Sequence, residues 1–144
     1  MIDREELTAG RGWAQASLRV ASEELDADAI GELLGRRPSS TRQSEGEPTF
    51  TVWVLESGLD PAAPIEDHLY ILMEGLRDRR EELRELTRRA NAEVWLSYSP
   101  EASGHRSAIF DHRVLADLGD LGLDLVLDPY PPGRARRAEP DRAD

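Results

Sequence analysis

The segment at residues 50–57 constrains the fold of this chain more than any other. It reads Phe-Thr-Val-Trp-Val-Leu-Glu-Ser, is rich in β-branched and aromatic residues, and lies between a proline and a glycine, as strands between turns do. Both of its alternating faces are apolar, with Val52 and Val54 on one and Trp53 and Leu55 on the other. A strand with water on one face alternates apolar and polar residues instead. We therefore expect a central strand that is covered, fully or in part, on both faces.

The length and the missing cysteines narrow the class of protein. A chain of 144 residues is the length of one domain, and such a domain buries roughly 68–70% of its unfolded surface, enough for a core without cross-links. The absence of cysteine excludes disulfides, thiolate nucleophiles and zinc–thiolate or iron–sulfur sites and fits a reducing cytoplasm. The first residues are charged, and no apolar run approaches the ~18 residues of a membrane span. We expect a cytoplasmic protein without a signal peptide or membrane contact.

The formal net charge of the chain is −11. An acidic body repels the phosphates of nucleic acids, so we expect no nucleic-acid partner. The same charge favours solubility, and it also suits contact with a basic protein partner.

Hydrophobic periodicity predicts two elements before the central strand. Residues 14–21 alternate between apolar and polar side chains, which predicts a strand with one core face. A short helix follows over residues 26–34, because Asp26 or Asp28 can cap its start, the apolar residues recur with helical spacing, and Gly35 can end it. Residues 36–48 are polar, contain two prolines and a glycine, and predict a long exposed loop.

The main helical region is predicted at residues 64–90. Its apolar stripe of leucines fails at Arg79 and Arg80 and resumes at Leu83 and Leu86. One unbroken helix of this length would measure about 40 Å, which is too long for so small a domain. We therefore expect a break near residues 77–79 that divides the region into two helices.

Four shorter elements are predicted after these helices. They are a strand at residues 93–99, a short strand at 107–110 after a loop, a helix from the cap Asp111 to about Gly119, and a last strand at 123–128 that Pro129 ends. The resulting order is β-α-β-α-α-β-β-α-β. We predict an α+β domain at residues 13–130, with a largely antiparallel sheet, helices mainly on one face, and a ferredoxin-like or duplicated βαβ arrangement. Residues 1–12 predict a flexible leader and residues 131–144 a disordered tail.

Several phrases of the sequence resemble a known bacterial family. They are Ala-Ser-Leu-Arg-Val at residues 16–20, the helical segment up to Gly35, Trp-Val-Leu-Glu-Ser at 53–57 with Ile-Glu-Asp-His-Leu at 65–69, and Leu-Gly-Leu-Asp-Leu at 121–125 closing on Asp-Pro-Tyr at 128–130. In this order and spacing they are similar to the family catalogued as domain of unknown function (DUF) 4279, over roughly residues 14–130. The resemblance supports one domain and implies no established activity.

The sequence contains no motif that requires catalysis, a metal or a cofactor. Serines lie near His105 and His112, but no Gly-x-Ser-x-Gly elbow is present. No two histidines have metal-ligand spacing, and no glycine-rich loop could cradle a phosphate. His68 lies beside two acids and one position before an apolar helical residue, which places it at the edge of the core. We therefore expect no catalytic residue, no metal and no cofactor.

The best candidate site is one face of the sheet. If Leu18, Val52, Val54, Val94 and Leu96 face the helices, the opposite face holds two tryptophans between charged residues. The members of this candidate face with side chains suited to binding are Arg19, Trp53, Trp95, Asp124 and Asp128. Tryptophan and arginine carry much of the energy of protein interfaces. One alternative is that Trp53 belongs to the core, with the face of its strand reversed. Another is that Leu83 and Leu86 of the second helical segment cover it.

Three functions follow as hypotheses. The first is a non-catalytic binding protein that acts through this face or its acidic surface, for example by neutralising a basic toxin or enzyme. The second is a small-molecule-binding or enzymatic domain with a pocket between sheet and helices, lined by His68, Arg19 and Asp128. The third is a homodimer formed through the sheet face.

Overall fold

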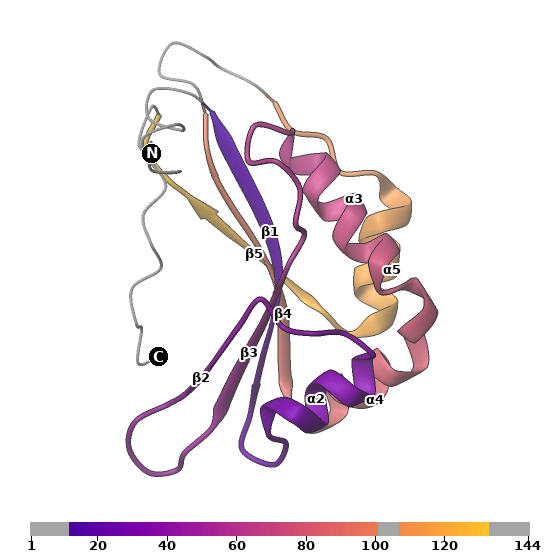
Figure 1. Ribbon diagram of the computed structural model, residues 1–144. Helices are drawn as coiled ribbons and strands as arrows, with labels where there is room; N and C mark the ends of the chain where they lie inside the picture. The colour runs from indigo at the N-terminus through magenta and orange to yellow at the C-terminus, as the bar shows by residue number, and fades with distance from the viewer. Residues whose placement is uncertain (1–11, 101–106, 133–144) are drawn as a thin grey trace.

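A computed structural model describes residues 12–100 and 107–132 of the chain. Its strands are β1 (Trp13–Ser22), β2 (Ser40–Gln43), β3 (Thr51–Glu56), β4 (Asn91–Ser99) and β5 (Asp124–Pro129), and its helices are α2 (Ala27–Leu34), α3 (Ile65–Gly75), the 3-10 turn η1 (Arg77–Arg79), α4 (Arg80–Arg89) and α5 (His112–Leu121). The sheet order is β2-β3-β1-β4-β5, and the described helices lie together on one side of it (Figure 1). The leader and the tail predicted at residues 1–12 and 131–144 lie almost wholly outside the described residues.

The first four strands confirm the ferredoxin-like prediction. The segment from β1 to β4 runs β-α-β-β-α-α-β, and β1 pairs antiparallel with both β3 and β4, while β2 pairs antiparallel with β3. Each crossover therefore joins two strands that are separated in the sheet by a third, which is the split βαβ pattern. Helix α5 then returns the chain to β5, which pairs parallel with β4 and makes the fold α+β with a mixed, mostly antiparallel sheet.

The middle of the sheet is β1, not the strand at residues 50–57. β3 lies between β1 and β2, so it is an interior strand, but the described helices cover only one of its faces. The expectation that both faces are covered, fully or in part, is met by the helices on one face and by partial shielding of the other. The apolar side chains on its second face, Val52 and Val54, are shielded to different degrees, since Val54 is buried and Val52 is half-buried.

Two predicted details of the strand order were also wrong. The loop predicted at residues 36–48 contains the edge strand β2, whose four polar residues carry no hydrophobic alternation. Residues 107–110, predicted as a strand, have no strand assignment among the described residues. The observed order is therefore β-α-β-β-α-α-β-α-β. The loop predicted at residues 100–106 lies outside the described residues except for Pro100.

The helix ends follow from local chemistry. The Asp26 carboxylate accepts a hydrogen bond from Ala29 N–H, and Asp111 caps α5 through Arg113 N–H in the same way. Gly35 and Gly122 end their helices in the left-handed conformation, with φ values of 62° and 75°. The predicted break at residues 77–79 is present as η1, where arginines replace the apolar residues that would otherwise face the sheet.

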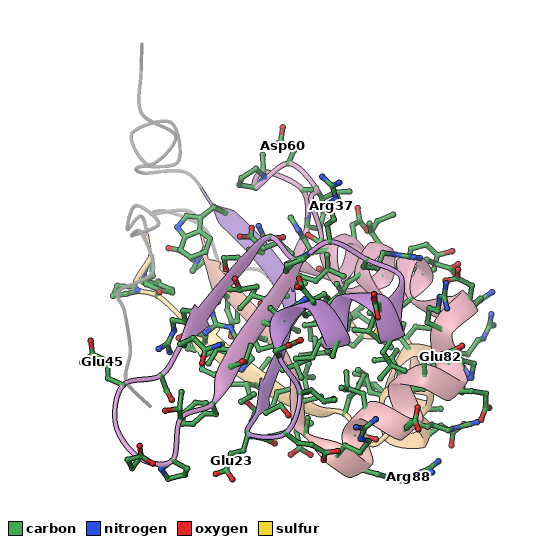
Figure 2. The ribbon with its side chains drawn as sticks, turned by 60° about the horizontal axis from the view of Figure 1, so that its bottom comes forward. Glu23, Arg37, Glu45, Asp60, Glu82 and Arg88 are labelled. Carbon is green, nitrogen blue, oxygen red and sulfur yellow. The ribbon has the colours of Figure 1, made fainter. Side chains whose placement is uncertain are left out.

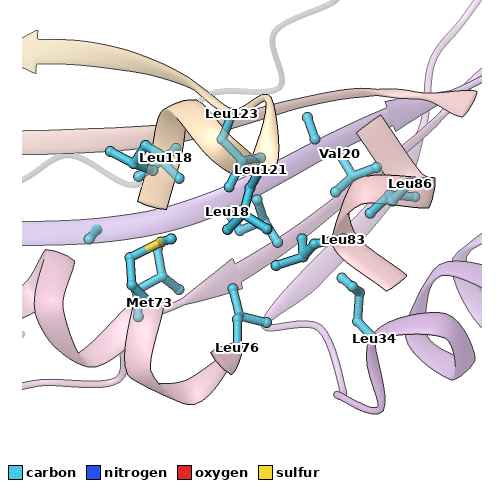
Figure 3. Close-up of a cluster of buried hydrophobic side chains, with 14 of the residues drawn as sticks. Leu18, Val20, Leu34, Met73, Leu76, Leu83, Leu86, Leu118, Leu121 and Leu123 are labelled. Carbon is cyan, nitrogen blue, oxygen red and sulfur yellow. The ribbon is translucent and has the colours of Figure 1, made fainter. Parts of the chain in front are cut away.

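The core fills the space between the helix layer and one face of the sheet (Figure 3). Leu18 and Val20 of β1 lie under Leu34 of α2, Leu83 of α4 and Leu76, which directly follows α3. Trp53 belongs to the same cluster and is fully buried. Charged side chains such as those of Glu23, Asp60 and Arg88 point away from the body of the molecule (Figure 2).

Two glycine substitutions test this account of the helix layer. Gly35→Ala should lower the free energy of unfolding by about 1–2 kcal/mol, since φ is +62° and an added Cβ would lie 2.7 Å from the Arg79 guanidinium. Gly119→Ala should instead raise it by about 0.5–1 kcal/mol, since a Cβ there meets no atom within 4 Å and alanine favours a helix interior. Urea denaturation of both variants measures the difference. Equal effects of the same sign would contradict the packing described for Gly35.

Candidate functional site

The candidate site is the face of the sheet opposite the helices, called here the open face (Figure 1). Side chains alternate along a strand and directly paired residues point the same way, so the odd-numbered residues of β1 define this face. Three adjacent rows cross it, and they read Val54–Arg19–Glu93–Asp124, Glu56–Ser17–Trp95–Val126 and Gln15–Ser97–Asp128. Every residue of these rows comes from a strand, so the backbone hydrogen bonds of the sheet fix their spacing.

Four of the five predicted binding residues share the open face. Arg19, Trp95, Asp124 and Asp128 all lie on it by their register. Trp53 does not, because it pairs with Val20 of the helix-covered face and is fully buried in the core. The placement of Trp53 on the candidate face was therefore wrong. The structure instead has the alternative in which Trp53 belongs to the core and the faces of the strand at residues 50–57 are reversed.

Arg19 and Trp95 form the centre of the open face. The Arg19 Cζ atom lies 4.2 Å from the centroid of the Trp95 ring, which is a cation–π contact. The indole N–H of Trp95 donates to Glu93 Oε1 at 3.3 Å. Because Glu93 is also the direct cross-strand partner of Arg19, the cation, the ring and the carboxylate hold one another in place.

Hydrogen bonds order the polar groups around this centre. The Ser97 hydroxyl donates to Asp128 Oδ2 at 3.0 Å, and Gln15 Nε2 donates to Glu56 Oε2. At one end of the face the rings of Trp13 and Tyr130 lie 5.0 Å apart at an angle of 57°. A polar surface that is internally hydrogen-bonded loses little side-chain entropy when it meets a partner.

The sequence did not single out Glu93, Glu56 and Gln15. Glu93 could have been found, since it occupies the same face as Trp95 in an alternating strand. Glu56 and Gln15 could not, because their contact spans 41 residues of sequence and depends on the register between β1 and β3.

His68 holds a loop against the sheet. It is fully buried, its Nδ1 lies 2.7 Å from the Ser57 hydroxyl, and its Nε2–H donates to the Asp60 carbonyl oxygen at 3.0 Å. Arg19 and Asp128 lie on the other side of the sheet from the helices. The three residues therefore do not line one pocket between the sheet and the helices, contrary to that prediction.

A groove of about 270 Å³ lies within the helix layer, among α3, α4 and α5. Its lining includes Tyr70, Arg80, Asp117 and Val114. The Arg80 guanidinium is 3.1 Å from the Asp117 carboxylate, so the charge there is already neutralised. At its rim, the hydrogen bond from Arg113 N–H lowers the pKa of Asp111. This groove could not be predicted from single segments of the sequence, because residues far apart in the chain, from Tyr70 to Leu121, line it.

The described residues show no centre for a metal and no helix for a membrane. Within residues 12–100 and 107–132, no three His, Asp or Glu side chains gather so that they could hold a metal ion. Among the helices of the described part of the chain, none has both the length and the apolar character needed to cross a bilayer. The serines and His105 considered for catalysis lie partly in residues 101–106, outside the described ranges.

Comparison with known proteins identifies the family. The model of the family "Domain of unknown function (DUF4279)" matches residues 11–132. The chain belongs to the DUF4279 family. This match spans all of the described residues, and so the fold given above is that of the family's domain in this chain. No curated protein and no solved structure matches the sequence.

A double-mutant cycle tests the centre of the open face. Arg19→Met and Trp95→Leu each remove the cation–π contact and leave an apolar side chain at the substituted position. Their combined effect on the free energy of unfolding should be smaller than the sum of the single effects by about 0.5–1 kcal/mol, since the contact can be lost only once. Urea denaturation of the four proteins measures this coupling. Strict additivity would show that the two side chains do not interact in solution.

Proposed function

We propose that this DUF4279 protein is a non-catalytic binding module whose open face contacts a basic protein partner. The observation that carries the proposal is the Arg19–Trp95 pair, fixed at the centre of a sheet face with carboxylates beside it. Arginine and tryptophan are the residue types enriched among the energetically dominant residues of interfaces.

The charge of the open face supports a basic partner. Its described carboxylates are Glu56, Glu93, Asp124 and Asp128, and its described guanidinium groups are those of Arg19 and Arg42. The face is thus net negative within a chain whose formal charge is −11. Complementary charge accelerates association and selects partners more than it adds affinity. A basic toxin or enzyme that must be captured quickly is the kind of partner this arrangement fits.

The rigidity of the face supports binding rather than catalysis. Trp95 is held by Arg19 on its ring and by Glu93 at its N–H, and Asp128 is held by Ser97. These side chains are already ordered, so a partner would not have to order them. An ordered sheet face is suited to contact with a protein surface, whereas small-molecule sites are concave.

Two matched triple variants test the proposal. The open-face variant carries Glu93→Gln, Asp124→Asn and Asp128→Asn, which keep the side-chain size and one oxygen at each position but remove three charges. The control variant carries Glu32→Gln, Asp67→Asn and Glu85→Gln, which remove three charges from exposed positions on α2, α3 and α4. Both variants have the same net charge, so any difference between them reports the location of the charge.

We expect the unmodified chain and the control variant to retain a basic protein from a native lysate. The open-face variant should retain the same protein at least tenfold more weakly. That difference should shrink as salt rises, because exposed charges are screened. Quantitative mass spectrometry of the retained proteins provides the measurement. If no protein distinguishes the two variants while both remain folded, the open face is not a binding surface.

A further inference from the structure

The strand β5 forms an edge of the sheet. Its inner side pairs with β4, and no strand of the described residues pairs with its outer side. Such an edge presents a row of backbone N–H and C=O groups that an added strand can use.

The backbone hydrogen bonds decide which residues of β5 point outward. Tyr130, directly after the strand, donates its N–H to the Tyr98 carbonyl oxygen of β4 at 2.8 Å. Alternate residues of a strand direct their backbone groups toward the same neighbour. The even-numbered residues of β5 therefore bond to β4, and Leu125 and Leu127 direct their N–H and C=O groups to the outer side.

Apolar and acidic side chains lie on opposite faces of the sheet along this edge. Leu127 is 54% exposed and Leu125 is half-buried, and both lie on the helix side of the sheet. Asp124 and Asp128 lie on the open face, with Val126 between them. The edge therefore combines apolar contact area on one side with two carboxylates, four positions apart, on the other.

The opposite edge of the sheet has a different character. β2 is four residues long and consists of Ser40, Thr41, Arg42 and Gln43, which are all polar and mostly exposed. Short polar edges of this kind discourage strand addition. Of the two edges, only β5 offers apolar side chains beside its outward backbone groups.

We propose that β5 is a strand-addition site for a basic, extended segment of a partner protein. This inference rests on the proposed function, of which it specifies the docking mode and the partner. A strand added beside β5 places alternate residues on each face. Such a strand fits both faces if arginine or lysine lies opposite Asp124 and Asp128, where it can pair with the carboxylates. Apolar residues of the same strand then lie opposite Leu125 and Leu127 and pack against them.

A second copy of this chain fits the edge poorly. In a symmetric antiparallel pairing of two β5 strands centred on Val126, Asp124 of each copy would face Asp128 of the other, and like charges directly opposite one another are destabilising. Pro129 at the end of the strand also shortens the pairing. The carboxylates thus oppose self-association and favour a basic strand.

The probe for this proposal is the synthetic peptide acetyl-Gly-Arg-Leu-Thr-Leu-Arg-Gly-amide. Its side-chain pattern reads the same in both directions, so it fits β5 in either orientation. Added to the ¹⁵N-labelled full chain, it should shift the backbone amide resonances of Leu125 and Leu127 most strongly, with a Kd below about 1 mM. The matched peptide with glutamate in place of both arginines should produce no such shifts.

Two variants of the chain locate the interaction. Leu127→Pro removes one outward N–H and should weaken peptide binding at least tenfold, while Leu127→Thr keeps the N–H and should weaken it less. Thermal unfolding of both variants checks that they remain folded.

Asp124→Asn with Asp128→Asn should weaken binding by about three- to tenfold, because each lost charge pair contributes modestly.

N-methylated peptides test strand addition without any substitution in the protein, so the result does not depend on whether Leu127→Pro folds. Each N-methyl group removes one backbone N–H donor from the peptide. One peptide carries N-methyl groups on both leucines and another on the arginines and threonine. Strand addition requires that one of the two lose binding, since only one set of N–H groups faces β5 in a given orientation. Binding by both peptides, or unchanged binding to folded Leu127→Pro, would overturn strand addition. A further outcome is that the arginine peptide shows no binding while the open-face variant still loses its protein partner. That result would contradict strand addition at β5 but not the proposed binding function of the open face.

Discussion

The fold depends on the burial of one face of β1. This strand pairs with β3 on one side and β4 on the other, and its even-numbered side chains, including Leu18 and Val20, are fully buried beneath the helices. Burial of side chains of this size supplies about 1.5–3 kcal/mol each. Because neighbouring strands pair with β1 in a fixed register, the choice of its buried face also decides which side chains of β3 and β4 reach the core.

The same choice creates the open face. Once Leu18 faces the helices, Arg19 must face the other way, and the pairing that buries Val94 opposite Leu18 places Glu93 and Trp95 beside Arg19. The candidate binding surface is therefore not a separate addition to the fold. It is the reverse side of the core, and its geometry is held by the same sheet.

Much of the fold could be predicted from the sequence because it rests on local signals. The helical spacing of leucines, the caps Asp26 and Asp111, and the arginines at residues 79 and 80 predicted the helices and the break between α3 and α4. β2 could not be predicted, since its residues are polar and only pairing with β3 makes them a strand. The face of Trp53 could not either, because both faces of its strand are apolar and the pairing with Val20 decides which one is buried. The open face needed the registers of three pairings, none of which a single sequence shows.

The most direct test of a core on one side of the sheet and an open face on the other is the accessibility of its tryptophans. Two single-tryptophan proteins, one retaining only Trp53 and one retaining only Trp95 with the others replaced by phenylalanine, can be titrated with acrylamide. Trp53, fully buried, should emit at shorter wavelength and resist quenching, while Trp95, which is partly exposed, should emit at longer wavelength and be quenched several-fold more readily. Equal protection of Trp95 and Trp53, or readier quenching of Trp53, would contradict the assignment of the two faces.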